Sequence, residues 1–122
     1  MEQNEELLKR AETQERIAKD FGFYWESLDQ LIEQIQSECQ EIKEAWEKND
    51  RNHLKEEVGD LLLAGISLAI FCRLDPHDTL KQSIEKFQIR YDKLVSLVHQ
   101  EGLESLKGQS LEVLLNYWKK AK

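Results

Sequence analysis

The chain has 122 residues and a formal net charge of −7, and 40% of its residues are hydrophobic. This length suits one domain with one hydrophobic core. The acidic balance argues against a tight complex with DNA or RNA, because such complexes need a basic surface. A single proline and five glycines, among many Glu, Lys, Leu and Gln residues, are typical of an all-helical protein.

The cysteines and the apolar segments indicate a cytoplasmic protein without a membrane partner. Cys39 and Cys72 form neither a metal-spaced pair nor a disulfide framework, which favours a reducing compartment. The N-terminus lacks the apolar segment of a signal peptide. The longest apolar run, at 61–72, is shorter than the ~20 residues that a bilayer requires. It indicates a central helix that is covered on nearly all sides, which in so small a domain favours a homo-oligomer.

The first two predicted helices are bounded by clear end signals. An amphipathic helix is expected from about Glu5 to Asp20, with a stop at Gly22. Ser27 and Gln30 have the spacing of a capping box and begin the second helix, which runs to about Glu47.

Three further helices are predicted from polar residues that can cap their N-termini. The third begins after Asp50 or Asn52 and runs to about Leu74. The fourth begins at Asp75-Pro76 and stops near Gly102, because proline is favoured at the first helical position. A short fifth helix follows the cap Ser110 and extends through Trp118.

Two pairs of carboxylates lie on the apolar faces of the second and third predicted helices. At roughly 100° per residue, Glu38 falls between Leu31 and Ala45 on a helical wheel, where solvated acids are not expected. Glu57 likewise falls among leucines. If the two helices pack antiparallel, one layer contains four acids: Glu38, Glu41, Glu57 and Asp60.

Four facing carboxylates repel one another, and protonation, Lys or Arg partners, or a bound divalent cation would relieve the repulsion. Only oxygen donors are present, which favours Mg²⁺ or Mn²⁺ over Zn²⁺ or copper. The alternative is that these acids are ordinary surface charges paired with neighbouring lysines. That alternative must explain why acids lie on the apolar faces of two separate helices.

Two other groups of residues have a functional and a structural interpretation. Lys86 and Arg90 lie four residues apart on the fourth predicted helix and could hold phosphate, or could form a solvated face with neighbouring acids. Trp25, Trp46 and Trp118 could stack on a base, although core packing or an oligomer contact is the commoner role of tryptophan. No histidine has the Glu-x-x-His spacing of di-iron bundles.

Several of these motifs, in this order, resemble the MazG family of nucleoside triphosphate pyrophosphohydrolases. The motifs are GFYW at 22–25, Glu38-x-x-Glu41, EEVGDLLLA at 56–64, the Lys86-Phe87-x-x-Arg90-Tyr91 element and Trp118-x-x-x-Lys122. The similarity covers residues 15–122, and looks most like the catalytic C-terminal domain of two-domain MazG proteins. It implies one MazG-like domain over residues 1–122, with 1–14 as a frayed N-terminal extension.

The resemblance implies an all-α antiparallel helical bundle that assembles as a homodimer or a dimer of dimers. It also implies Mg²⁺-dependent cleavage of an NTP or dNTP to NMP and pyrophosphate, with Mn²⁺ as a substitute metal. The implied metal ligands are Glu38, Glu41, Glu57 and Asp60. The implied substrate contacts are Gln34, His53, Glu56, Lys86, Arg90, Trp118 and Lys122. The chain departs from the family at Tyr24, where many relatives have Asp, and at Ile84, where relatives often have Asn.

Other functions fit the same residues. The acids act on a phosphate chain and do not specify the base, so the substrate could be dUTP or phosphoribosyl-ATP. A non-catalytic helical oligomer that binds nucleotide is the alternative from a different class. Either Glu41 or Glu56 could serve as the general base, and their spacing does not decide between them.

Overall fold

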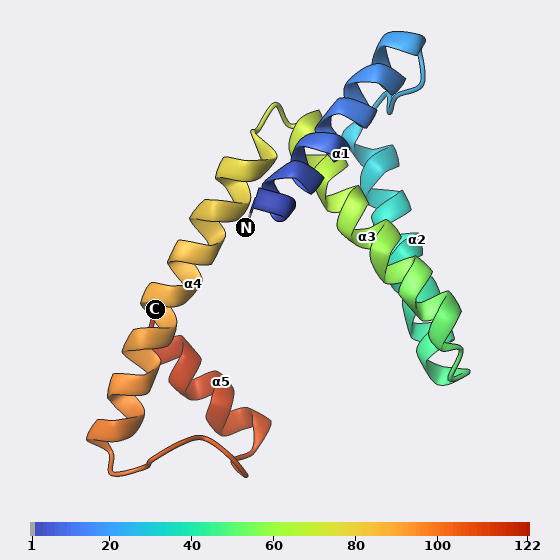
Figure 1. The fold of residues 1–122 in the computed structure, drawn as a ribbon. Coiled ribbons are helices and arrows are strands. Elements are labelled where there is room, and N and C mark those ends of the chain that lie inside the picture. The colour runs from blue at the N-terminus through green and yellow to red at the C-terminus, as the bar shows by residue number, and fades with distance from the viewer. Residues whose placement is uncertain (1) are drawn as a thin grey trace. The chain divides into compact units, whose positions relative to one another are not determined.

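The protein is all-α in the part that the computed structural model describes, which is residues 2–122, with the backbone alone for 2–5 (Figure 1). The helices are α1 Glu2–Phe21, α2 Leu28–Glu47, α3 Arg51–Phe71, α4 Pro76–Gln100 and α5 Leu111–Lys120. These helices confirm the fold class that the sequence indicates. Residues 2–14, expected as an N-terminal extension, are part of α1, and residue 1 of that extension lies outside the described residues.

The predicted capping residues begin the helices. The Ser27 hydroxyl accepts a hydrogen bond from the Gln30 backbone at 3.2 Å, and the Gln30 side chain accepts one from the Ser27 backbone at 3.3 Å. Asp50, not Asn52, caps α3 by accepting the His53 N–H at 3.1 Å. These bonds satisfy backbone donors that the first turn of a helix leaves free.

The later helices follow the same rule. Asp75 accepts the Asp78 N–H at 2.9 Å at the start of α4, and Ser110 accepts the Val113 N–H at 3.3 Å at the start of α5. The end of α3 differs from expectation, because the helix stops at Phe71 rather than near Leu74. Arg73 has a left-handed φ of 61°, which an α-helix cannot contain.

The chain divides into two compact units within α4, after Thr79. The first unit contains α1, α2, α3 and the first turn of α4. The second contains the rest of α4, the 101–110 loop and α5. The expectation of a single domain over residues 1–122 stays a prediction.

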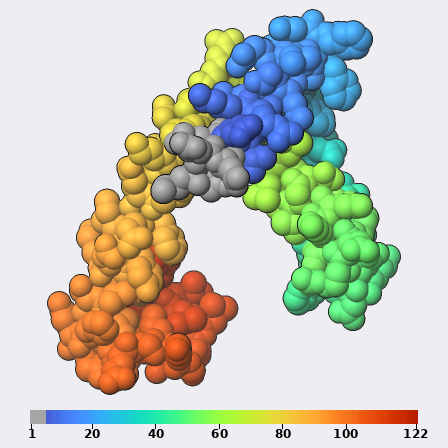
Figure 2. Space-filling view, viewed as in Figure 1, coloured from blue at the N-terminus to red at the C-terminus, as the bar shows by residue number. Residues whose placement is uncertain are grey.

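In the first unit, α3 packs against both α2 and α1 (Figures 1 and 2). Leu31 and Ala45 of α2 are each only 1% exposed. The Ser67 hydroxyl of α3 contacts Glu15 of α1 and donates to the Leu63 carbonyl at 3.2 Å. A short loop that begins at Lys48 joins α2 to α3, so these two helices run antiparallel and bring their inner faces together.

The described residues leave part of the apolar surface of α3 uncovered. Leu62 is 69% exposed, Leu63 43% and Val58 38%. The interpretation of this helix as covered on nearly all sides is therefore not met by the chain's own helices. Burying such a face stabilises a fold by about 25 cal/mol per Å² of apolar surface, which is the driving force for a partner to cover it.

Side chains join α5 to α4 in the second unit. Val98 of α4 and Ala121 after α5 are 3% and 2% exposed. The Tyr117 hydroxyl is hydrogen-bonded to Glu101, which follows α4. The last part of the chain is thereby held beside α4.

Candidate active site

Three carboxylates meet between α2 and α3. Oxygen atoms of Glu38, Glu41 and Glu57 all lie within 4.8 Å of one another. Glu38 and Glu57 are each 8% exposed, and Glu41 is half-buried. The period of an α-helix explains the arrangement, because Glu38 lies on the same face of α2 as the buried residues Leu31 and Ala45.

One oxygen of each buried acid lacks a hydrogen-bond partner. Glu38 Oε2 and Glu57 Oε2 are buried and accept no hydrogen bond from the described residues. The other Glu38 oxygen, Oε1, accepts a hydrogen bond from the Gln34 amide at 2.8 Å. Burying an unpartnered carboxylate oxygen is costly, so these two atoms require a proton or a cation.

The cluster changes the acidity of Glu57. A proton on Glu57 allows its carboxyl group to hydrogen-bond first to Glu38 and then to Glu41. These bonds, burial and the negative charge of both neighbours raise the pKa of Glu57 from 4.5 to about 8. Without a cation, Glu57 therefore holds a proton at neutral pH. A divalent cation among the three oxygens would take the place of that proton.

The residues fit a hard divalent cation. Three convergent carboxylates, two of them with an unpartnered buried oxygen, are the ligands that Mg²⁺ and Mn²⁺ prefer. Gln34 holds one oxygen of Glu38 and leaves the other without a partner among the described residues.

Three other expected residues surround the cluster on α3. Asp60, one turn after Glu57, is exposed and stands outside the group of three. His53 Nε2 lies 3.6 Å from Glu57 Oε1. Glu56 is exposed. The structure thus brings together three of the four expected ligands and places His53 beside one of them.

The remaining expected residues belong to the second unit. Arg90 and Trp118 are in contact, with the Arg90 guanidinium 4.2 Å from the centre of the Trp118 ring. Phe87 also packs against Trp118, at 5.4 Å between ring centres. Lys86 and Lys122 are exposed.

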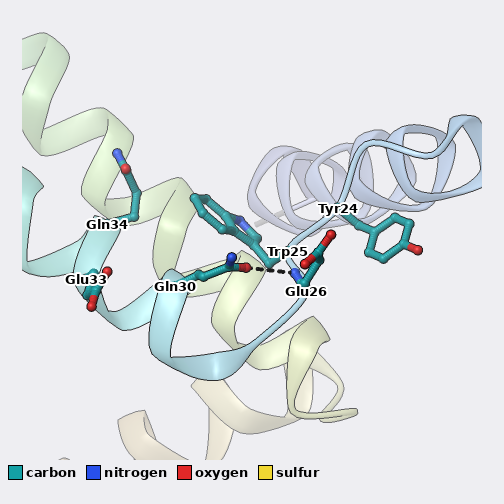
Figure 3. Close-up of a pocket in the computed structure, with 6 residues that line it drawn as sticks. All are labelled: Tyr24, Trp25, Glu26, Gln30, Glu33 and Gln34. Atoms are coloured by element: carbon teal, nitrogen blue, oxygen red, sulfur yellow. Dashed lines mark hydrogen bonds between the residues drawn. The ribbon is translucent and has the colours of Figure 1, made fainter.

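A pocket at the N-terminal end of α2 was not expected from the sequence (Figure 3). It has a volume of about 490 Å³ and is lined by Tyr24, Trp25, Glu26, Gln30, Glu33 and Gln34. A spacing of four residues relates Glu26, Gln30, Gln34 and Glu38. Within α2 that spacing places Gln30, Gln34 and Glu38 on one side of the helix, whereas Glu26 precedes the helix. The spacing of the three helical residues is a signal that could link this pocket to the acids.

A second group of ligand-type residues, Asp75, His77 and Asp78, lies at the start of α4. Asp75 and Asp78 are exposed, and Asp75 already caps the helix. This group lacks the buried unpartnered oxygens that distinguish the Glu38 cluster.

Among the described residues, no helix is both long and apolar enough to cross a membrane.

Comparison with curated proteins gives relatives over most of the chain. A nucleoside triphosphate pyrophosphohydrolase/pyrophosphatase MazG of Thermotoga maritima is 37% identical over 105 residues, which is 86% of this chain and 40% of that protein. A nucleoside triphosphate pyrophosphohydrolase of Escherichia coli K12 is 31% identical over 117 residues, which is 94% of this chain and 44% of that protein. The chain thus spans less than half the length of these relatives.

The family model gives the same assignment. The model of the MazG nucleotide pyrophosphohydrolase domain matches residues 26–95, which is more than half of the chain and includes all of α2 and α3. The matched segment contains the three clustered acids. With its helices, its acidic cluster and these relatives taken together, the chain belongs to the MazG nucleotide pyrophosphohydrolase domain family.

Proposed function

We propose that this protein is a Mg²⁺-dependent pyrophosphohydrolase that cleaves a nucleoside or deoxynucleoside triphosphate to the monophosphate and pyrophosphate. The observation that carries the proposal is the pair of buried, unpartnered oxygens on Glu38 and Glu57, which face a third carboxylate. Such an arrangement is unfavourable without a cation and suits one that binds phosphate. The names of the two relatives support the same reaction.

Glu38, Glu41 and Glu57 would hold the metal, with Asp60 as a fourth ligand. Asp60 lies three residues after Glu57, so the two side chains project from adjacent positions of α3. When bound, Mg²⁺ supplies charge neutralisation of the phosphates and lowers the pKa of a water molecule. Mn²⁺ would substitute, because it accepts the same oxygen ligands.

The protein's own groups would orient the substrate and accept the proton of the attacking water. Lys86 and Arg90 would hold phosphate oxygens, and Trp118 and Lys122 would contact the nucleotide. In the first unit, His53 and Glu56 of α3 would line the substrate site beside the acids. Glu41 and Glu56 are both candidates for the general base, because each is less buried than Glu38 and Glu57.

We also propose that the working unit is a homo-oligomer in the cytoplasm. The exposed apolar side chains of Val58, Leu62 and Leu63 on α3 support the oligomer, because a second copy would remove them from water. Cys39 and Cys72 are both free, as suits a reducing compartment.

A panel of NTPs and dNTPs tests the reaction. With Mg²⁺, the protein should release pyrophosphate and not orthophosphate, and Glu57→Gln should abolish the release. Glu47→Gln, an exposed acid on α2, is the matched control and should retain it. Nucleotide binding without turnover would instead favour the non-catalytic alternative. Release of pyrophosphate by Glu57→Gln at the wild-type rate would contradict the assignment of the acids.

A further inference from the structure

The pocket at the start of α2 differs chemically from the acidic cluster beside it. Among its lining residues are two aromatic side chains, Tyr24 and Trp25, and two amides, Gln30 and Gln34. The lining contains two carboxylates, Glu26 and Glu33, and no Lys, Arg or His. Such a surface repels a phosphate and attracts a neutral group that donates hydrogen bonds.

The two amides have defined orientations because their partners have only one hydrogen-bonding role. Gln30 Oε1 accepts the backbone N–H groups of Glu26, at 3.1 Å, and Ser27, at 3.3 Å. Its NH₂ group is therefore the end that remains for the pocket. Gln34 uses its NH₂ group to donate to Glu38 at 2.8 Å, so its carbonyl oxygen remains for the pocket. The pocket thus presents a donor and an acceptor one turn apart.

An aromatic surface accompanies these two groups. The Trp25 indole is 37% exposed, and Figure 3 shows it on the same side of α2 as the Gln34 side chain. An exposed indole beside a donor and an acceptor is a surface on which a heterocyclic base can stack while its edge is hydrogen-bonded.

The position of the pocket relates it to the acids. Gln34 lines the pocket and also bonds Glu38, so the pocket and the cluster share a side chain. Gln34 precedes Glu38 by one helical turn, a rise of roughly 6 Å. That separation suits a nucleotide whose phosphates lie at the acids and whose base lies beside Gln34.

A second pocket on the other side of Trp25 is a poorer candidate for the base. Most of its lining residues are apolar or aromatic, including Ala11, Ala18, Phe23 and Leu63. It offers a base a surface but few groups to bond its edge. It also lacks the link through Gln34 to the acids.

We propose that Trp25, Gln30 and Gln34 form the base-recognition pocket and that it selects bases with an exocyclic amino group. This inference rests on the proposed function, because it assumes that the substrate is a nucleotide. The Gln34 carbonyl accepts a hydrogen bond from the amino group of the base. The Gln30 NH₂ group donates one to an adjacent ring nitrogen or carbonyl, and the Trp25 ring stacks on the base. A base with a carbonyl in place of the amino group leaves the Gln34 oxygen facing another acceptor.

ATP and ITP form the matched pair for the test, since they differ by an amino group replaced with a carbonyl. The wild-type protein should prefer ATP in kcat/KM on the order of tenfold, the usual effect of an unpaired polar group at a specific site. Gln34→Leu should reduce this preference, and the part that remains comes from Gln30, whose NH₂ group faces an N1 acceptor in ATP but an N1–H donor in ITP. Because Gln34 also orients Glu38, the ATP to ITP ratio is the readout and not the absolute rate.

Variants of Trp25 test the stacking surface separately. Trp25→Ala should raise KM for both nucleotides on the order of tenfold with little change in kcat, and Trp25→Phe should restore most of the loss. Trp46→Ala is the control, because Trp46 lies at the opposite end of α2 and is 66% exposed. It should leave KM unchanged.

Calorimetric binding of AMP and IMP gives a readout that does not depend on turnover. Tighter binding of AMP than of IMP, with a smaller difference in Gln34→Leu, supports the pocket even if no triphosphate is hydrolysed, in which case the proposed function fails alone. Release of pyrophosphate with equal kcat/KM for ATP and ITP, and no effect of Trp25→Ala, would overturn the pocket and leave the proposed function standing.

Discussion

Arg90 of α4 contacts both the backbone carbonyl and the ring of Trp118, in the last turn of α5. Its Nε and Nη2 atoms donate to the Trp118 carbonyl at 3.0 and 2.6 Å, and its guanidinium lies 4.2 Å from the centre of the Trp118 ring. The spacing of Lys86 and Arg90 leaves a phosphate contact and a solvated face open, and the resemblance to the MazG family implies that Arg90 contacts the substrate. The observed contacts add a second role, which is to hold the segment that ends in Trp118 and Lys122.

The two roles of Arg90 predict different effects of substitution. Arg90→Ala should lower the free energy of unfolding by about 1.5 to 3 kcal/mol, the usual value of hydrogen bonds from a charged group, and weaken nucleotide binding at least tenfold. Arg90→Lys keeps the charge but cannot make the paired contact. Urea unfolding and KM measure the two effects.

Rescue of KM by Arg90→Lys without rescue of stability would indicate that phosphate binding needs only the charge. If Arg90→Lys rescues neither KM nor stability, nucleotide binding depends on the placement of Trp118. Lys81→Ala, an exposed cation on the same helix, is the control. Wild-type kinetics and stability in Arg90→Ala would remove both roles.

The acids should be required for chemistry and not for folding. Glu38→Gln, Glu57→Gln and Asp60→Asn should each abolish turnover. Metal-free thermal stability should be equal or greater for the two buried positions, because an amide replaces one member of a group of acids that repel one another. Asp60→Asn tests whether the metal has a fourth ligand, since Asp60 is exposed and outside the cluster. Full activity of Asp60→Asn would reduce the ligand set to three.

Helical periodicity was sufficient to place Glu38, Glu41 and Glu57, because a charge on an apolar face of a regular helix can be located from spacing alone. Helical periodicity does not fix the position of the Asp60 side chain, because that position depends on how α2 and α3 cross and on the side-chain rotamer. The helix starts at Ser27, Asp75 and Ser110 were predictable for a similar reason. A capping bond is local, within three residues of the cap.

Two parts of the site depend on contacts that no local pattern encodes. Arg90 and Trp118 are separated by a loop with no periodicity, so nothing in the sequence pairs the guanidinium with that carbonyl. The direction of Trp25 is set by the non-helical segment before α2, where the chain has no repeating geometry. Gln30 and Gln34 can be grouped with Glu38 from the sequence, because all three lie in α2 at a spacing of four residues.

The raised pKa of Glu57 predicts how metal-free stability depends on pH. Its pKa is 4.5 when unfolded and about 8 when folded. Between these values the folded state binds more protons, so the free energy of unfolding should fall as pH rises from 5 to 8 and then level off. Thermal unfolding in the presence of a chelator, from pH 5 to 9, measures this slope.

Glu57→Gln should flatten that slope, whereas Glu47→Gln should preserve it. Added Mg²⁺ should raise the unfolding temperature more at pH 8 than at pH 6, because the cation competes with the Glu57 proton. A metal effect that is equal at both pH values would show that the cation binds elsewhere.

The exposed face of α3 predicts that the active species is an oligomer. Leu62 is 69% exposed although it lies in the middle of an apolar helix. Leu62→Glu places a charge on that face and should dissociate the assembly and abolish activity together, because desolvating an unpaired carboxylate in an interface is costly. Light scattering at the assay concentration measures the mass.

Lys55→Glu, an exposed position on the same helix, is the control for the added charge and should keep the wild-type mass. A fully active wild-type species of 14.4 kDa would refute the oligomer, and dissociated but active Leu62→Glu would separate assembly from catalysis.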